Sequence, residues 1–335
     1  MRRSHAAALV LLLAVPLSLP SGAVTSPLQH YEATRLSMGC VYAIEVYGRN
    51  GPSLTATVGD AFDEIDRLDR LMSHYQPRSP LSRINRDAGA GPVPVEPELF
   101  DFIAAAIGYA RQSDGAFDIT VGPLMKAWGF FGGDGHMPST AALAEARRHV
   151  GAAHVVLDAR AHTIRFDEPG VELDLGGIAK GYAVDRAVGI LRAGGVSAAL
   201  VSAGGSTIYA LGTPPLSDGW QLSVQDPVDS RRTARTIRLT DRALSIAGSS
   251  EKSFAVDGVR YSHIMDPRTG QPVQGMLSVA VVAASGIAGD VLDDALFVLG
   301  PARSRAYLKQ WPAVDAMFFM PAAGGSWTVV EEGHR

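Results

Sequence analysis

Residues 278–299, SVAVVAASGIAGDVLDDALFVL, place a run of β-forming residues directly before an oily segment that contains three aspartates. The run 278–283 is typical of a strand, and Gly289–Leu299 is typical of a helix. Asp290, Asp293 and Asp294 have the spacing i, i+3 and i+4, which brings their side chains onto one face of that helix. The stretch therefore predicts a mixed fold of strands and helices.

The aspartate cluster requires a partner. Three unpaired anions beside a buried apolar stripe would repel one another and lose hydration, at a cost of several kcal/mol. Oxygen-only ligands favour a hard cation such as Mg²⁺ or Ca²⁺. The alternative is that Asp290 caps the helix and that all three carboxylates complement its N-terminal dipole.

The composition is that of an ordinary globular protein. The chain has 335 residues, 47% of them hydrophobic and 19% charged, which allows one large domain or two lobes. The formal net charge of -4 argues against a nucleic-acid partner bound by bulk electrostatics. An anionic ligand must therefore be held by a local pocket.

The N-terminus is typical of an export signal, which we assign to residues 1–25. Arg2 and Arg3 precede an apolar run over 6–19, and small residues at 21–23 suit cleavage. The run is too short and too interrupted by proline for a good membrane span, although an uncleaved anchor is the alternative. Because no cysteine follows it, we expect no lipid attachment and a soluble periplasmic protein.

Cys40 is the only cysteine, so no intrachain disulfide can form. Its strand-like surroundings favour a small core residue over a nucleophile. An exported chain without disulfides is compatible with a bacterial periplasm.

Helical and strand-like patterns alternate along the remaining chain without a fixed-period repeat. Helical spacing is present in residues 58–71, Leu99–Tyr109, Thr140–His149 and about Ala179–Leu191. Strand-like runs are Met38–Tyr47, His154–Leu157, Thr163–Phe166, Val171–Leu173, Ala198–Ser202, Thr207–Leu211, Trp220–Val224, Thr236–Leu239, Ser278–Ala283 and Val314–Met320. We expect an α+β fold over residues 28–335, with two lobes of mostly antiparallel sheets and flanking helices, and a cleft between the lobes.

Residues 171–185, VELDLGGIAKGYAVD, are typical of a strand, a glycine turn and a helix. A helix that begins after glycines presents free backbone N–H groups to a phosphate, and Lys180 could add a positive charge. The stretch lacks the Gly-Lys-Ser/Thr ending of a P-loop and the Gly-x-Gly-x-x-Gly of a dinucleotide fingerprint. A tight turn without a ligand is the alternative.

Two further motifs carry weaker signals. Residues 261–272, YSHIMDPRTGQP, place His263 near a strand end, where it could act as a general base or acid. A lone histidine is more often structural. The stretches 115–124, GAFDITVGPL, and 128–130, WGF, could stack a planar ring, with core packing as the alternative.

Together and in this order, these segments closely resemble the FAD:protein FMN transferase family. The matching segments are residues 38–40, 72–75, 82–85, 115–118, 128–130, 174–182, 262–270 and 290–300. The match spans roughly residues 35–300, and the last three segments are highly specific.

The resemblance implies an activity that the residues alone do not name. Family members bind FAD and a divalent metal, cleave the pyrophosphate, and join FMN through a phosphoester to a Ser or Thr hydroxyl of an exported target protein, releasing AMP. The FAD contacts of the family fall on Met38, Tyr75, Ala116, Phe117, Asp118, Asp174, Lys180 and Ile264. Its metal contacts fall on Gly177, through backbone oxygen at most, and on Asp290, Asp293 and Asp294.

The resemblance also implies a mechanism. Mg²⁺ is expected to neutralise the pyrophosphate, and His263 is the candidate for activating the acceptor hydroxyl. The expected partner is an exported redox protein with a Ser/Thr acceptor site. An FAD pyrophosphatase that gives FMN and AMP, and a non-catalytic periplasmic flavin-binding protein, are the competing interpretations.

This chain departs from the family pattern at several positions. Ile246 and Ala247 stand where Thr and Ser are common, which removes two hydroxyls that could touch the flavin or its phosphates. Asp294 stands where Thr is usual, and Ser206 replaces a frequent Asp. These departures concern affinity and acceptor choice rather than the fold.

Overall fold

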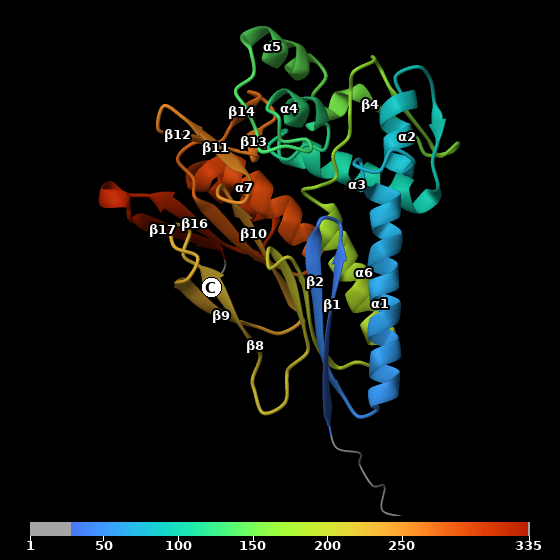
Figure 1. Cartoon of the computed structure of the whole chain (residues 1–335), viewed down its shortest axis with the longest axis vertical. Coiled ribbons are helices and arrows are strands. Elements are labelled where there is room, and N and C mark those ends of the chain that lie inside the picture. The colour runs from blue at the N-terminus through green and yellow to red at the C-terminus, as the bar shows by residue number, and fades with distance from the viewer. Residues whose placement is uncertain (1–27, 334–335) are drawn as a thin grey trace, which may run out of the picture.

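The computed structural model describes residues 28–333 (Figure 1), so the expected signal peptide at residues 1–25 lies outside the described part. Its centre is an eight-stranded sheet in which every neighbouring pair is antiparallel. In sheet order the strands are β1 (Gln29–Ser37), β2 (Cys40–Gly48), β6 (Ala198–Ala203), β7 (Thr207–Leu211), β10 (Arg242–Gly248), β15 (Ser278–Ala283), β16 (Asp315–Pro321) and β17 (Trp327–Gly333).

One face of this sheet packs against three long helices, α1 (Gly51–Met72), α6 (Ala179–Ala193) and α7 (Gly286–Tyr307). The helix α1 begins where the side chain of Asn50 accepts a hydrogen bond from Ser53 N at 3.3 Å. Its apolar side chains recur with helical spacing and are buried against the sheet. The main hydrophobic core therefore lies between the sheet and these helices.

The other face is covered by the hairpin of β8 (Trp220–Gln225) and β9 (Thr233–Leu239). Trp220 lies in this second core, and its indole N–H donates to the carbonyl of Leu211 at 3.1 Å. Alternate residues of β8 are buried and exposed, as expected for a strand with one face on a core.

The remaining elements gather at one end of the molecule, above the sheet in Figure 1. The helices are α2 (Pro80–Asp87), α3 (Pro97–Gln112), α4 (Gly122–Ala127) and α5 (Thr140–Arg148). The strands are β3 (Val93–Pro94), β4 (Val155–Asp158), β5 (Thr163–Phe166), β11 (Ser253–Val256), β12 (Val259–Ser262), β13 (Met265–Asp266) and β14 (Gln271–Pro272). Short 3₁₀ helices occupy Ala152–His154, Leu308–Gln310 and Ala323–Gly325.

The α6 and α7 helices cross at two glycines. A Cβ atom at Gly181 would lie 2.3 Å from the carbonyl oxygen of Gly286, and one at Gly286 would lie 2.7 Å from that of Gly181. Any larger residue at either position would force the helices apart. Among residues 28–333, no helix is both long enough and apolar enough to cross a membrane.

The α+β class and the antiparallel sheets are confirmed, but the expected strand at Val171–Leu173 is wrong. The side-chain amide of Asn85 donates to the carbonyl of Leu173 at 2.9 Å, and its oxygen accepts from Leu173 N at 2.8 Å. A side chain thus takes the backbone groups that a neighbouring strand would use. The strand expected over Met38–Tyr47 begins only at Cys40, because Met38 and Gly39 form the preceding turn.

Candidate active site

One cavity of about 670 Å³ brings together all the residues that the sequence analysis assigned to the site. They come from six separate segments of the chain, and each of them lines this cavity. The expected flavin contacts in its wall are Met38, Tyr75, Ala116, Phe117, Asp118, Asp174, Lys180 and Ile264. The expected metal and catalytic residues in its wall are Gly177, Asp290, Asp293, Asp294 and His263.

Met38 reaches the cavity from a tight hairpin turn between β1 and β2. Met38 and Gly39 both have positive φ angles, of 47° and 74°, which is unusual for methionine. The phenol of Tyr42 donates to the sulfur of Met38 at 3.2 Å. A strained residue held at a cavity is typical of a functional position.

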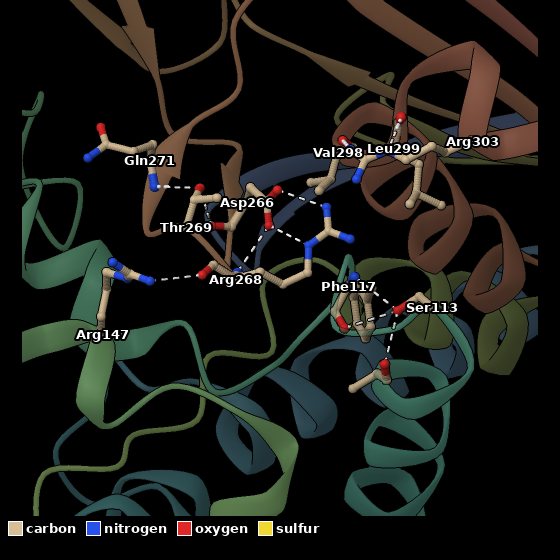
Figure 2. A network of polar contacts seen from close by, with 11 residues as sticks. Ser113, Phe117, Arg147, Asp266, Arg268, Thr269, Gln271, Val298, Leu299 and Arg303 are labelled. Carbon is tan, nitrogen blue, oxygen red and sulfur yellow. Dashed lines mark hydrogen bonds and ion pairs between the residues drawn. The ribbon is translucent and has the colours of Figure 1, made fainter.

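The loop that contains Ala116, Phe117 and Asp118 is fixed from within. The hydroxyl of Ser113 accepts a hydrogen bond from Phe117 N at 3.1 Å (Figure 2). The carboxylate of Asp118 accepts from Thr120 N at 2.8 Å, Thr120 Oγ1 at 2.6 Å and Ala152 N at 2.9 Å. Asp118 therefore organises the loop through its side chain and lies within the cavity wall.

The turn after Ile264 is fixed in a similar way. Asp266 accepts two hydrogen bonds from the guanidinium of Arg268, both at 2.8 Å, and a third from Arg268 N at 3.0 Å (Figure 2). The hydroxyl of Thr269 donates to the carbonyl of Asp266 at 3.3 Å. This turn holds the chain segment that follows His263 in a single conformation.

The glycine turn before α6 brings the N-terminus of a helix and one buried cation to the cavity. Asp174 Oδ1 accepts from Gly176 N at 2.8 Å, which shapes the turn. Lys180 Nζ donates to the hydroxyl of Ser206 at 2.6 Å. Burial lowers the pKa of Lys180, but the nearby Asp290, Glu251 and Asp293 outweigh burial, and the net shift is upward. Lys180 is therefore a charged group inside the cavity.

Asp290 is held by three donors. Its Oδ1 accepts from Thr207 Oγ1 at 2.7 Å and Ser245 Oγ at 2.8 Å, and its Oδ2 accepts from Gly181 N at 2.6 Å. The alternative in which Asp290 caps its helix is wrong. Ser285 is the N-cap residue, and Asp290 lies beyond the first turn.

Asp293 and Asp294 differ from Asp290 because the charge on them is poorly compensated. Burial, followed by the charges of Asp294 and Asp290, raises the pKa of Asp293 well above its usual range. Burial and the charge of Asp290 raise the pKa of Asp294 to about 7. A nearby cation would relieve this repulsion.

The carboxylates in the cavity wall are oxygen donors of the kind that a hard cation prefers. Within residues 28–333, no group of three or more His, Cys, Asp or Glu side chains is arranged to hold an ion. Mg²⁺ does not require such a group, since it is usually held by one or two carboxylates together with phosphates and water. A Cβ atom at Gly177 would lie only 2.4 Å from Asp294 Oδ2, so this carboxylate lies directly against the glycine turn. Asp293 and Asp294 are therefore the carboxylates that would hold such an ion, whereas Asp290 already accepts three hydrogen bonds.

His263 is a neutral imidazole that can act as a base. Its Nδ1 lies 3.3 Å from the carbonyl oxygen of Lys252, which can only accept a hydrogen bond. The proton therefore belongs on Nδ1, and the lone pair of Nε2 is free. Burial lowers the pKa of His263, so the ring is neutral near neutral pH. A neutral imidazole in the cavity wall can accept a proton from a hydroxyl.

Among the cavity residues that were not assigned to the site from sequence, four bear on its chemistry. Thr207 and Ser245 position Asp290, while His74 and Glu251 add further titratable groups to the wall. Ser245 lies in β10, a strand that the sequence analysis missed, so its inward direction could not be inferred. His74 is next to the expected flavin contact Tyr75 in the sequence, and this position was the one feature that could have indicated its place in the site.

Comparison with known proteins places this geometry in one family. Residues 38–318 match the ApbE family. The chain belongs to the ApbE family. The FAD:protein FMN transferase of Treponema pallidum is 32% identical over 88% of this chain and 85% of its own length. The enzyme of the same name from Salmonella typhimurium is 30% identical over 82% and 80%.

Solved structures agree with this assignment. The ApbE protein of Thermotoga maritima superposes with a TM-score of 0.80 at 32% identity, over 90% of this chain and 96% of that chain. The apo flavinyl transferase ApbE of Pseudomonas stutzeri gives 0.80 at 29% identity, over 91% and 95%. The common name of the ApbE relatives identifies this chain as a transferase.

Proposed function

We propose that the protein transfers FMN from FAD to a Ser or Thr hydroxyl of an exported target protein, with Mg²⁺ present, and releases AMP. One observation carries this proposal. A single cavity gathers a neutral histidine, a buried lysine, a glycine turn at a helix N-terminus and two uncompensated carboxylates. Such a set suits in-line phosphoryl transfer, in which positioning and charge stabilisation supply most of the catalysis.

The chain's own residues have separate tasks in this reaction. The N–H groups of the glycine turn and the ammonium of Lys180 hold the diphosphate. His263 Nε2 takes the proton of the acceptor hydroxyl while the hydroxyl oxygen forms a bond to the FMN phosphorus. The bond from that phosphorus to the AMP oxygen breaks, and AMP leaves as an anion. A Mg²⁺ ion held by Asp293 and Asp294 would neutralise charge on the phosphates.

The departures at Ile246 and Ala247 do not remove this machinery. Both residues line the cavity in β10, directly after Ser245, whose hydroxyl holds Asp290. Export to the periplasm and a redox protein as acceptor follow from the family resemblance and the N-terminal sequence, and they belong to the same proposal.

The direct test incubates the purified protein with FAD and Mg²⁺, with and without an exported redox domain that carries a Ser/Thr acceptor. We expect flavin fluorescence that stays with the acceptor after denaturation, together with one AMP per flavin attached. Free FMN and AMP in both reactions would instead indicate a pyrophosphatase. Unaltered FAD would indicate a binding protein.

The His263→Ala variant tests the assignment of the base. We expect transfer to fall below detection while FAD binding stays within about threefold of wild type, because the histidine acts on the acceptor. Unchanged transfer kinetics would exclude His263 from the mechanism.

A further inference from the structure

His74 lies immediately after α1 in the sequence, in the wall between two cavities. It lines the main cavity and a smaller one of about 200 Å³, whose wall includes Lys126 and Phe131. The side chain is only 9% exposed, and Nε2 is buried without any hydrogen-bond partner. A buried polar atom without a partner is rare in a folded protein and needs an explanation.

The surroundings of Nδ1, the other ring nitrogen, determine whether Nε2 is a donor or an acceptor. Nδ1 of His74 faces Oδ1 of Asp174 at 3.4 Å, where a nitrogen lone pair would be repelled by the carboxylate and an N–H group is attracted to it. Nδ1 therefore carries the proton. Burial lowers the pKa of His74 even though Asp174 opposes the shift, so the ring is neutral. Nε2 is consequently a hydrogen-bond acceptor without a donor.

Aromatic rings lie against this acceptor. The ring of His74 is 4.0 Å from that of Tyr75 and 5.0 Å from that of Phe131, measured between centroids. Tyr75 and Phe131 stack on each other at 5.0 Å with an interplanar angle of 17°. Tyr75 is 51% exposed although it is a large aromatic residue, so its ring can turn away with little loss of packing.

The position therefore offers a flat aromatic wall and one acceptor. A planar heterocycle that replaced the ring of Tyr75 beside His74 would keep the stacking and could supply the missing donor. FAD has two ring systems of this kind, each with an N–H group: the adenine amine and the flavin imide. The phosphate-binding turn adjoins the same wall, because Asp174 contacts both His74 and Gly176.

We propose that His74 is a specificity-determining residue of this enzyme, whose Nε2 accepts a hydrogen bond from a ring N–H of FAD when Tyr75 turns away from the stack. The inference rests on the proposed function, because it names FAD as the ligand. The family resemblance does not assign a role to His74. With this hydrogen bond, His74 would favour ligands whose ring edge carries an N–H donor.

Three variants test the inference in the full-length mature chain, with FAD affinity measured by flavin fluorescence. His74→Phe keeps a flat ring but has no hydrogen-bond acceptor. His74→Asn keeps a polar group near the position of Nδ1 but has none at the position of Nε2. We expect both to bind FAD about tenfold more weakly, the loss typical of one hydrogen bond. His74→Gln places an amide oxygen within reach of the Nε2 position and should stay within about threefold of wild type.

The same titrations with FMN and with ADP distinguish the two ends of FAD. A loss for FMN alone assigns His74 to the flavin imide, and a loss for ADP alone assigns it to the adenine amine. Equal FAD affinities of the wild type, His74→Phe and His74→Asn would overturn the inference while leaving the proposed function intact. Failure of the wild-type chain to bind FAD would overturn both.

Discussion

Buried carboxylates at the first turn of α7 and at its later turns differ in whether backbone N–H groups are available to them. At the first turn, Asp185 from α6 accepts hydrogen bonds from Gly286 N at 2.7 Å and Ile287 N at 3.0 Å. These N–H groups have no partner within their own helix. Further along the helix, Asp293 and Asp294 lie where the backbone N–H groups are already used. Burial and mutual repulsion therefore dominate there.

The difference separates a structural carboxylate from one kept for a ligand. Asp185 satisfies free helix donors and fixes α7 against α6. The raised pKa values of Asp293 and Asp294 mean that their charged forms oppose folding, and we infer that a bound cation compensates for this. Four predictions test the contrast, in order of decreasing effect.

The largest effect is expected for Asp293→Asn. Loss of a charged oxygen ligand should reduce the initial rate of flavin attachment to an acceptor domain by about 1,000-fold, which is the scale of lost transition-state stabilisation. Asp185→Asn is the matched control and should stay within about threefold of wild type. Near-normal turnover of Asp293→Asn, with its dependence on divalent ions retained, would contradict a metal role.

Magnesium should stabilise the wild-type chain in the absence of flavin. At a concentration of 100 times its Kd, an ion that binds only the folded state adds about 2.7 kcal/mol to the free energy of unfolding. Thermal unfolding with increasing Mg²⁺ measures this gain. We expect Asp293→Asn and Asp294→Asn to lose most of it, so equal gains in all three proteins would count against this site.

Removing the capping carboxylate should have a smaller, purely structural effect. Asp185→Ala leaves two helix N–H groups without their partner and should lower the free energy of unfolding by about 1–2 kcal/mol. Asp293→Asn should not lower it in metal-free buffer, because the amide removes like-charge repulsion. Urea denaturation of the two variants compares them, and a loss of equal size in both would remove the distinction.

The last prediction is a pH dependence of stability. Burial raises the pKa of Asp185 to about 6, although hydrogen bonds from Ile287 and Gly286 oppose the shift. The folded pKa lies above the unfolded value near 4, so the folded state binds more protons in this interval. The proton-linked part of this stability is complete below pH 4 and is lost as the pH rises through 6, whereas the ionised carboxylate keeps its hydrogen bonds from Gly286 N and Ile287 N. Asp185→Asn should flatten this part of the urea-derived stability profile, and an unchanged slope would contradict the assignment.

Much of the fold could be predicted because periodicity reports burial directly. The strands at Thr163–Phe166, Thr207–Leu211 and Ser278–Ala283 have the predicted bounds, and α5 begins directly after its Ser139 cap, as the sequence indicates. The missed β10 has the sequence RALSIAG, in which consecutive small and apolar residues hide the alternation. Both of its faces are covered, because Ala243 and Ala247 lie in the core on the helix side of the sheet and Leu244 and Ile246 pack in the core under the β8–β9 hairpin.

The sequence indicated which residues line the cavity, but it did not indicate the hydrogen bonds between them. Family motifs located thirteen residues that line one cavity, but they could not show that Asp118 and Asp290 each accept three hydrogen bonds from the protein. Those bonds come from Thr120, Thr207 and Ser245, and two of these lie on strands whose register only the folded sheet defines. Long-range pairing of this kind has no local signature.

The contact of Gly181 with Gly286 means that backbone alone sets the width of the reaction site. Lys180 and Asp185 are carried by one partner of this contact, and the aspartates by the other. A larger residue at either position of the crossing would therefore change their separation, because it would push α6 and α7 apart. Substitution of either glycine should therefore disturb the spacing of the charged groups in the cavity as well as the packing of the two helices.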